Sequence, residues 1–305
     1  MICVVVQPIH AAGLEVLRRG GVEPVLAPST DLADLAPLLS HAEAVITRNW
    51  GFPAEAVALS PALRVVGVHG SGTDRVAMAA LRDRAIALFS TPGTNAQSVA
   101  EHALGLMLAV ARGIPSGDRA MKAGDFAYRE RFAGLELAGL CLGLWGWGSV
   151  ASALAPMALG LRMEVLVLSN HASEDELTAS GIARARSLDH LLTASDVVSL
   201  HGRPGAGPVL GRAEISRMRA GAIVINTARG ALIDEGALGD ALRAGRLFGA
   251  GLDVLTQEPP APGSLLLGCP RLILTPHVGG TTEAASRRTA QAVAHKVVFA
   301  LRTVT

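Results

Sequence analysis

The sequence predicts an α/β fold with parallel sheets, and two observations lead to this class. Short Val/Ile/Leu-rich runs bounded by turn residues recur along the chain, and segments of helical composition stand between many of them. Strands of a parallel sheet are buried on both faces and so form continuous apolar runs, and their alternation with helices is typical of βαβ units. The chain has 305 residues, of which 50% are hydrophobic, so it can bury a large core, and its length suggests two domains.

The elements follow in order along the chain. In a first α/β block we expect strands at residues 2–7, 44–47, 65–68 and 86–90, and helices at about 11–19, 31–41 and 53–59. The turn Pro92–Asn95 precedes a longer helix over about 96–112. A second block begins near residue 139, with strands at 140–145, 163–168, 222–226, 248–255 and 272–276, a helix ending at about 159, and a last helix at 282–302.

Composition and charge exclude several classes of function. The formal net charge of +1 gives no basic field for nucleic acid. No charged residue occurs between Glu136 and Arg162, but glycines, serines and a proline split this run into a strand and a short helix, so we expect no membrane span. The N-terminus lacks the features of a signal peptide, which predicts a cytoplasmic protein. The three cysteines are expected to be reduced thiols, and no residue set has metal-ligand spacing.

A glycine-rich turn predicts a dinucleotide site. The strand at 140–145 leads into Gly146-Trp147-Gly148-Ser149-Val150-Ala151, and a helix and a further strand follow. Gly146 permits the tight turn, Gly148 lets a pyrophosphate approach the backbone, and the small Ala151 allows the helix to pack closely on the strand. The amides at the start of the helix, from Ser149 and Val150 on, can then bind the phosphates.

Three polar residues each follow an apolar run near the end of the chain. Arg229 follows 222–226, Glu258 follows 248–255 and His277 follows 272–276. In open α/β sheets ligands bind beyond the carboxyl ends of the strands, so these side chains are expected to meet at one cleft. A cation, a carboxylic acid and an imidazole can together anchor an anionic substrate and move a proton. The pattern therefore predicts an enzyme.

Several ordered segments resemble the D-isomer-specific 2-hydroxyacid dehydrogenases over essentially the whole chain. They are Pro92–Asn95, Ser98–Glu101, Asn226–Gly230, Leu252–Val254, Glu258–Pro259 and Thr275–His277. The resemblance implies a Rossmann domain at 97–282, with a doubly wound parallel sheet, inserted in a smaller flavodoxin-like α/β substrate domain made of 1–96 and 283–305. It also implies an active site in the cleft between the domains and a homodimer.

The resemblance assigns chemistry to individual residues. His277 is the expected general acid that protonates the 2-oxo oxygen as hydride arrives from the nicotinamide, and Glu258 hydrogen-bonds the imidazole and favours its charged form. Arg229 is expected to hold the substrate carboxylate and carbonyl with its forked donors. The turn His69–Gly72 is expected to offer backbone amides to the carboxylate. The substrate-binding set is Arg48, Gly70, Ser71 and Gly72.

The cofactor is expected to be NADP or NAD, with NADP favoured. After the second strand of the Rossmann domain, Ser169, Asn170 and His171 stand where an NAD site has an acid for the ribose 2′-hydroxyl, so a 2′-phosphate meets no fixed negative charge. Asp253 is expected to contact the nicotinamide carboxamide, although it could instead cap the backbone of a tight turn. The full expected cofactor set is Gly146, Gly148, Ser149, Val150, Ser169, Asn170, His201, Thr227, Asp253 and Gly279.

Two other functions remain open from sequence. A non-catalytic dinucleotide sensor of the same superfamily could keep the same three polar residues. A formate dehydrogenase carries glutamine where Glu258 stands, and Gln257 is adjacent, so the assignment depends on which residue meets His277. Expected substrates are small 2-oxo acids such as glyoxylate or hydroxypyruvate, with phosphoglycerate as the next possibility. Arg48 could pair with a second anionic group of the substrate or be a solvated strand end.

Overall fold

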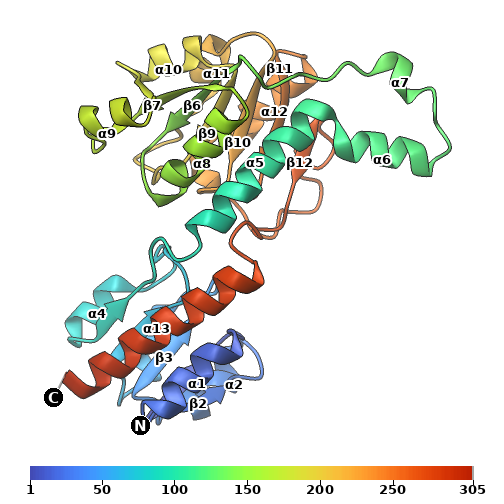
Figure 1. Ribbon diagram of the computed structural model, residues 1–305. Coiled ribbons are helices and arrows are strands. Elements are labelled where there is room, and N and C mark those ends of the chain that lie inside the picture. Colours follow the sequence, from blue (N-terminus) through green and yellow to red (C-terminus); the bar gives the residue numbers. More distant parts are fainter. Residues whose placement is uncertain (304–305) are drawn as a thin grey trace. The chain divides into compact units, whose positions relative to one another are not determined.

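The computed structural model describes residues 1–303. The chain folds into two compact units (Figure 1). Unit 1 contains Met1–Asn95 and the segment that starts at Gly280, and unit 2 contains Ala96–Gly279. The division lies one residue before the first predicted boundary and three residues before the second. The chain therefore passes from unit 1 to unit 2 and returns.

Unit 1 is built on a parallel sheet with the strand order β2-β1-β3-β4-β5. The strands are β1 (Ile2–Val5), β2 (Glu23–Leu26), β3 (Ala44–Thr47), β4 (Val65–Val68) and β5 (Ala87–Phe89). The helices are α1 (Ala11–Arg19), α2 (Leu32–Leu39), α3 (Ala54–Ala58), α4 (Met78–Asp83) and α13 (Glu283–Thr303). Successive side chains of a strand point to opposite faces. Val4 and Val45 pack with α2 and α3, whereas Val5 and Ile46 pack with α1 and α13.

The C-terminal helix α13 belongs to unit 1 because small residues let it approach the rest of that unit closely. A Cβ added at Gly13 would lie 2.7 Å from Ala290 O, and one added at Gly67 would lie 2.6 Å from Val293 Cγ2. Lys296 of α13 also donates a hydrogen bond to Ser90 O at 2.7 Å. The last helix thus covers one face of the sheet made by the first 95 residues.

Unit 2 carries a parallel sheet with the order β12-β11-β10-β9-β6-β7-β8. The strands are β6 (Cys141–Trp145), β7 (Glu164–Leu168), β8 (Ala183–Arg184), β9 (Val197–Leu200), β10 (Ala222–Asn226), β11 (Leu247–Leu252) and β12 (Leu272–Leu274). From β6 the chain adds β7 and β8 on one side, then returns to place β9 on the other side. The order therefore reverses between β6 and β9, and in such sheets the ligand crevice forms at that point.

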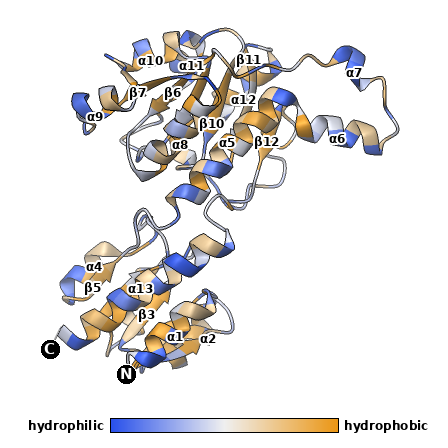
Figure 2. Cartoon of the chain, viewed as in Figure 1, coloured by the Kyte–Doolittle hydropathy of each residue, from blue (hydrophilic) through white to orange (hydrophobic). Residues whose placement is uncertain are grey.

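Helices cover both faces of the unit 2 sheet. α5 (Ala96–Arg112), α8 (Ser149–Gly160) and α9 (Glu174–Ala179) pack on one face, and α10 (Leu188–Ala194), α11 (Arg212–Arg217) and α12 (Glu235–Arg243) on the other. α6 (Ile114–Lys122) and α7 (Tyr128–Arg131) follow α5. Figure 2 shows the strands of this sheet in hydrophobic colours and part of α9 in hydrophilic ones. Within residues 1–303 none of the helices combines the length and apolar character needed to cross a membrane.

The predicted α/β class with parallel sheets is confirmed, and five predicted elements have the observed bounds: 11–19, 44–47, 65–68, 96–112 and 222–226. The run 248–255 ends as a strand at Leu252, and the side chain of the next residue, Asp253, accepts hydrogen bonds from the loop that follows β12. Three strands, β2, β8 and β9, were not predicted from sequence. The same holds for α4, α6, α7 and the helices between residues 174 and 243. β2 contains Pro24 and lies at the edge of its sheet, where a proline is tolerated, and β8 has two residues.

Candidate active site

The glycine-rich turn joins β6 to α8 at the carboxyl edge of the sheet. Gly146 has φ +94°, and a Cβ there would lie 2.9 Å from Gly202 N, so the turn requires glycine. Within residues 1–303, a Cβ at Gly148 would meet nothing within 4 Å and no side chain caps this end of α8. Ala151 is fully buried between helix and sheet. An open turn and uncapped helix amides fit a pyrophosphate.

The turn after β7 contains Ser169, Asn170 and His171, with no carboxylate among them. Ser169 Oγ accepts hydrogen bonds from the amides of His171 at 3.1 Å and Ala172 at 3.3 Å. Arg184 on β8, which was not predicted as a site residue, donates to Ser169 O at 2.8 Å and pairs with Glu174 at 2.6 Å. A guanidinium therefore lies against this turn, with an acid beside it.

His201 and Thr227 follow β9 and β10. His201 Nε2 lies 2.8 Å from Ser199 Oγ, and burial lowers the pKa of the imidazole from 6.5 to about 4, so the ring is neutral at pH 7. Thr227 Oγ1 is buried and has no hydrogen-bond partner among residues 1–303. An unpartnered buried hydroxyl calls for a ligand or a water. Together with the open glycine turn, Thr227 shows that these residues fit a bound dinucleotide.

Asp253 holds the loop that follows β12. Its carboxylate is 2% exposed and accepts hydrogen bonds from Thr275 Oγ1 at 2.6 Å, Val278 N at 2.9 Å and Gly279 N at 2.8 Å. His102 Nε2 of α5 lies 3.3 Å from Asp253 Oδ1 and 2.9 Å from Thr275 Oγ1. Asp253 therefore acts as a structural anchor in this loop, the alternative left open by the sequence. Its contact with a nicotinamide stays a prediction.

Arg229, Glu258 and His277 follow the carboxyl ends of three neighbouring parallel strands, β10, β11 and β12. His277 Nδ1 lies 2.9 Å from Glu258 Oε2. Glu258 Oε1 accepts from Leu255 N at 3.1 Å, which fixes the carboxylate. The residue that meets His277 is thus Glu258 and not Gln257.

Backbone geometry fixes the positions of Arg229 and His277. Asn226 accepts from Ala228 N at 3.0 Å and donates to Arg229 O at 2.8 Å, and Arg229 Nη1 donates to Ala228 O at 2.7 Å. His277 has φ +55°, a left-handed conformation that costs a non-glycine residue free energy. Its amide donates to Asp253 O at 2.9 Å and Thr275 O at 3.0 Å. The strained residue is therefore held by its own backbone and by Asp253.

The expected substrate-binding residues of unit 1 follow β3 and β4. Arg48 Nη1 donates to Pro8 O at 2.7 Å, and burial lowers the pKa of Arg48. Burial first, and the charge of Arg48 second, lower the pKa of His69 from 6.5 to about 4. The Gly70 amide donates to Thr91 Oγ1 at 2.9 Å, and within the described residues the amides of Ser71 and Gly72 have no hydrogen-bond acceptor. Contact of these residues with a substrate carboxylate stays a prediction, with Ser71 and Gly72 as the amides that still have a proton to donate.

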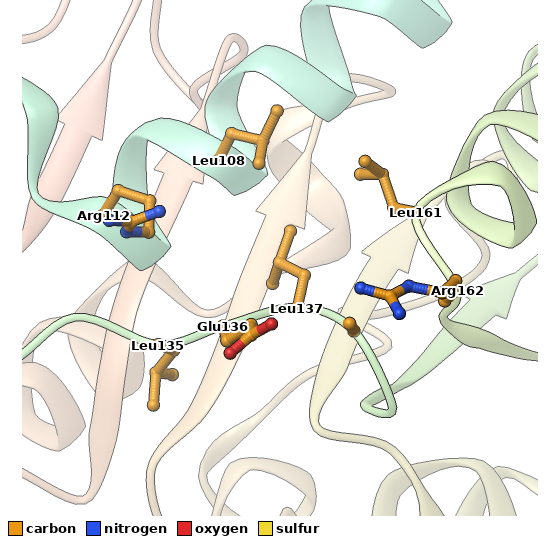
Figure 3. Close-up of a pocket in the computed structure, with 8 residues that line it drawn as sticks. Leu108, Arg112, Leu135, Glu136, Leu137, Leu161 and Arg162 are labelled. Carbon is orange, nitrogen blue, oxygen red and sulfur yellow. The ribbon is translucent and has the colours of Figure 1, made fainter.

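A cavity of about 210 Å³ lies elsewhere in unit 2 (Figure 3). The residues that line it lie near the end of α5 and in the segments just before β6 and β7. The cavity is therefore at the amino edge of the sheet, opposite the glycine turn. It contains none of the predicted site residues. The lining residues are Leu108, Arg112, Leu135, Glu136, Leu137, Ala138, Leu161 and Arg162.

Comparison with known proteins identifies relatives. Residues 104–279 match the family model of the D-isomer specific 2-hydroxyacid dehydrogenase NAD binding domain. A D-3-phosphoglycerate dehydrogenase of Archaeoglobus fulgidus is 33% identical over 96% of this chain, which covers 56% of that protein. The chain thus spans about half the length of the first curated relatives that it matches. A hydroxypyruvate reductase of Thermotoga maritima is 30% identical over 95% of both chains.

Solved structures agree with the sequence comparison. A Thermus thermophilus protein superimposes with a TM-score of 0.90 at 33% identity, over 99% of this chain and 97% of the other. A glyoxylate reductase of Paecilomyes thermophila gives a TM-score of 0.88 at 27% identity, over 100% of this chain and 96% of the other. With the matched domain, the relative of equal length and the histidine–glutamate pair at the sheet edge, the chain belongs to the D-isomer-specific 2-hydroxyacid dehydrogenase family.

Proposed function

We propose that this protein is an oxidoreductase that transfers a hydride between a nicotinamide cofactor and a small 2-oxo or D-2-hydroxy acid. The observation that carries the proposal is the pair of His277 Nδ1 and Glu258 Oε2 at 2.9 Å, on loops after adjacent strands of a dinucleotide-type sheet. A binding-only role has less support, because a sensor has no need of an imidazole held in this way. The relatives named above as a dehydrogenase or a reductase are enzymes by name, which favours a catalytic role.

His277 is the proposed acid–base residue. A carboxylate only accepts hydrogen bonds, so Glu258 requires a proton on Nδ1 and leaves Nε2 as the atom that exchanges a proton with the substrate oxygen. In reduction Nε2 gives its proton to the 2-oxo oxygen, and in oxidation the neutral ring takes it back. The nicotinamide, when bound, supplies or accepts the hydride.

Arg229 is the proposed anchor of the substrate carboxylate and carbonyl. A guanidinium can bind two oxygens in parallel and can polarise the carbonyl, which a point charge does less well. In unit 1 we assign carboxylate contacts to the amides of Ser71 and Gly72. Arg48 would contact the second anionic group that only the phosphoglycerate alternative carries. Unit 2 is proposed to hold the cofactor and unit 1 to contribute to substrate binding.

NADP is the proposed cofactor in preference to NAD. The turn at Ser169–His171 offers hydroxyl, amide and imidazole donors and no carboxylate, and Arg184 adds a positive charge against the same turn. Arg184 is also paired with Glu174, so we expect a preference of modest size. An NADPH-dependent glyoxylate/hydroxypyruvate reductase of Sinorhizobium meliloti, 25% identical with a TM-score of 0.88, supports the same cofactor.

Glyoxylate and hydroxypyruvate are the proposed substrates, with phosphoglycerate as the alternative. The relative of equal length is named a hydroxypyruvate reductase, whereas the phosphoglycerate dehydrogenases that match are about twice as long. A second anionic group would need a cation such as Arg48, which is already engaged with Pro8 O. A small, singly charged 2-oxo acid needs no such partner.

We also propose a homodimer. α6 and α7 contain no buried residue, so this stretch is not part of the core of unit 2. Ile114, Met121 and Phe126 on this stretch are 57%, 59% and 60% exposed, and exposed apolar side chains favour association when they form a patch. Light scattering should give twice the chain mass, and Met121→Glu should lower it. A monomeric mass for the wild type would refute the dimer.

The test of function is oxidation of NADPH and NADH, in parallel, across a panel of 2-oxo acids. We expect glyoxylate and hydroxypyruvate to be reduced, faster with NADPH, and the chiral product to have the D configuration. Cofactor binding without turnover of any acid would favour the sensor role. Efficient reduction of 3-phosphohydroxypyruvate alone would instead select the phosphoglycerate alternative.

A further inference from the structure

We propose that His102 is a positioning residue for His277, acting through Thr275 and Asp253. His102 lies on α5, far from the catalytic loops in sequence, and its Nε2 is 2.9 Å from Thr275 Oγ1 and 3.3 Å from Asp253 Oδ1. Thr275 is two residues before His277. The inference rests on the proposed function, because it assigns His277 the proton transfer.

The hydrogen bonds fix which proton His102 carries. The Asp253 carboxylate has no proton to give and accepts the Thr275 hydroxyl at 2.6 Å. That hydroxyl has a single proton, so Thr275 Oγ1 is left as an acceptor toward His102 Nε2. His102 must therefore carry its proton on Nε2 and donate it to Thr275, with Asp253 Oδ1 as a second, longer acceptor. The chain of donors runs from His102 through Thr275 to Asp253.

This chain ends at the loop that presents His277. Asp253 accepts the amides of Val278 and Gly279 with its side chain and the amide of His277 with its carbonyl. The left-handed φ of His277 persists only if these contacts outweigh its cost. His102 orients the Thr275 hydroxyl at the start of the loop and so fixes Asp253 relative to it.

Close packing supports the same role. A Cβ at Gly279 would lie 2.9 Å from Asp253 Oδ2 and 3.4 Å from His102 Cδ2, so the loop is drawn against both side chains. His102 is 24% exposed and Asp253 is 2% exposed, which makes the hydrogen bonds between them poorly replaced by water. A histidine that served only to fill space would not need its Nε2 at this place.

Two variants separate positioning from packing. His102→Leu keeps an apolar side chain but removes the donor, and His102→Gln places an amide nitrogen near the position of Nε2. His190→Leu is the matched control, because His190 lies on α10 and its Nδ1 accepts a hydrogen bond from the Arg186 amide, away from the catalytic loops. Each variant is compared in turnover, in KM and in amide hydrogen exchange at Val278 and Gly279.

His102→Leu is expected to lower kcat by about 10- to 100-fold, the range for a misplaced catalytic group, with KM for the 2-oxo acid little changed. Exchange at Val278 and Gly279 should become faster. His102→Gln should restore both toward wild type, and His190→Leu should match wild type. Wild-type kcat and exchange in His102→Leu, or equal defects in the Leu and Gln variants, would overturn the proposal.

The exchange measurement separates failure of this inference from failure of the proposed function. If wild-type protein reduces none of the 2-oxo acids, the proposed reaction is wrong. The exchange rates then still decide whether His102 holds the loop. If the wild type is active but His102→Leu leaves both readouts unchanged, the positioning role alone is wrong.

Discussion

Glu258→Gln is the substitution that probes the proposed acid–base pair most sensitively. Glu258 Oε1 accepts the Leu255 amide and Oε2 meets His277 Nδ1 at 2.9 Å. A glutamine has one oxygen, so if this oxygen keeps the Leu255 amide, the NH₂ group faces Nδ1. Nδ1 must then accept a hydrogen bond, which disfavours the imidazolium and moves the remaining proton of the neutral ring to Nε2. The variant lacks both the acid form and the free Nε2 of the base form.

The size of the effect follows from exposure of the pair. A hydrogen bond to a charged group contributes about 1.5–3 kcal/mol and a neutral one about 0.5–1.5 kcal/mol. His277 is 38% exposed and Glu258 is 26% exposed, so water partly replaces the lost contact and the smaller difference applies. The lower ends of the two ranges differ by about 1 kcal/mol, which corresponds to about a fivefold change, since about 1.4 kcal/mol is tenfold. We expect kcat to fall about fivefold in both directions.

The assay is steady-state kcat for reduction and oxidation, together with the dissociation constant of the reduced cofactor. Gln257→Glu is the matched control, because Gln257 is exposed and lies next to Glu258. This substitution adds the negative charge that Glu258→Gln removes. It should keep wild-type rates, and adding it to Glu258→Gln should not rescue turnover. Wild-type rates in Glu258→Gln, with unchanged cofactor binding, would refute the pairing argument.

Three further predictions concern other residues. Arg229→Lys should raise KM and lower kcat together, because an ammonium cannot rebuild a bidentate contact, and unchanged kinetics would contradict its anchoring role. Ser169→Asp should weaken NADPH strongly and leave NADH unchanged or better, as like charges cost several kcal/mol, and a wild-type preference for NADH of about tenfold would contradict the NADP proposal. His201→Gln should make the stability of the protein less sensitive to acid pH. The pKa of His201 is about 4 in the folded protein and 6.5 in the unfolded chain, so its contribution to stability is complete above pH 6.5, and up to about 3 kcal/mol is lost as pH falls toward 4. If the melting temperatures of wild type and variant fell equally steeply with decreasing pH, other groups would cause the loss.

Much of the fold could be predicted from sequence because buried parallel strands form unbroken apolar runs. Ala222–Asn226 is an unbroken apolar run ending in a turn residue, and it is buried on both faces as a central strand between β9 and β11. β2 was missed because Glu23 and Pro24 break its apolar run, and only pairing with β1 makes it a strand. The C-terminal helix was predicted from its sequence, whereas the prediction that it belongs to unit 1 depended on the family resemblance.

The parts of the site that could be predicted are those with a local signal in the sequence. Gly146, which has a positive φ in the structure, stands in a glycine-rich turn, and polar residues follow apolar runs that end as strands. His102 gave no such signal, because it lies within a helix among Ala and Leu and meets Thr275 and Asp253 only after folding. The same holds for Arg184, whose contact with the Ser169 turn depends on β8 pairing with β7.

The most direct test of the central claim is turnover of His277→Ala with the cofactor bound. We expect kcat for reduction of glyoxylate or hydroxypyruvate to fall by about two to four orders of magnitude, the range for loss of general acid catalysis, while the dissociation constant of NADPH stays near the wild-type value. Reduction by His277→Ala at nearly the wild-type rate, with NADPH bound, would show that the proton comes from another group.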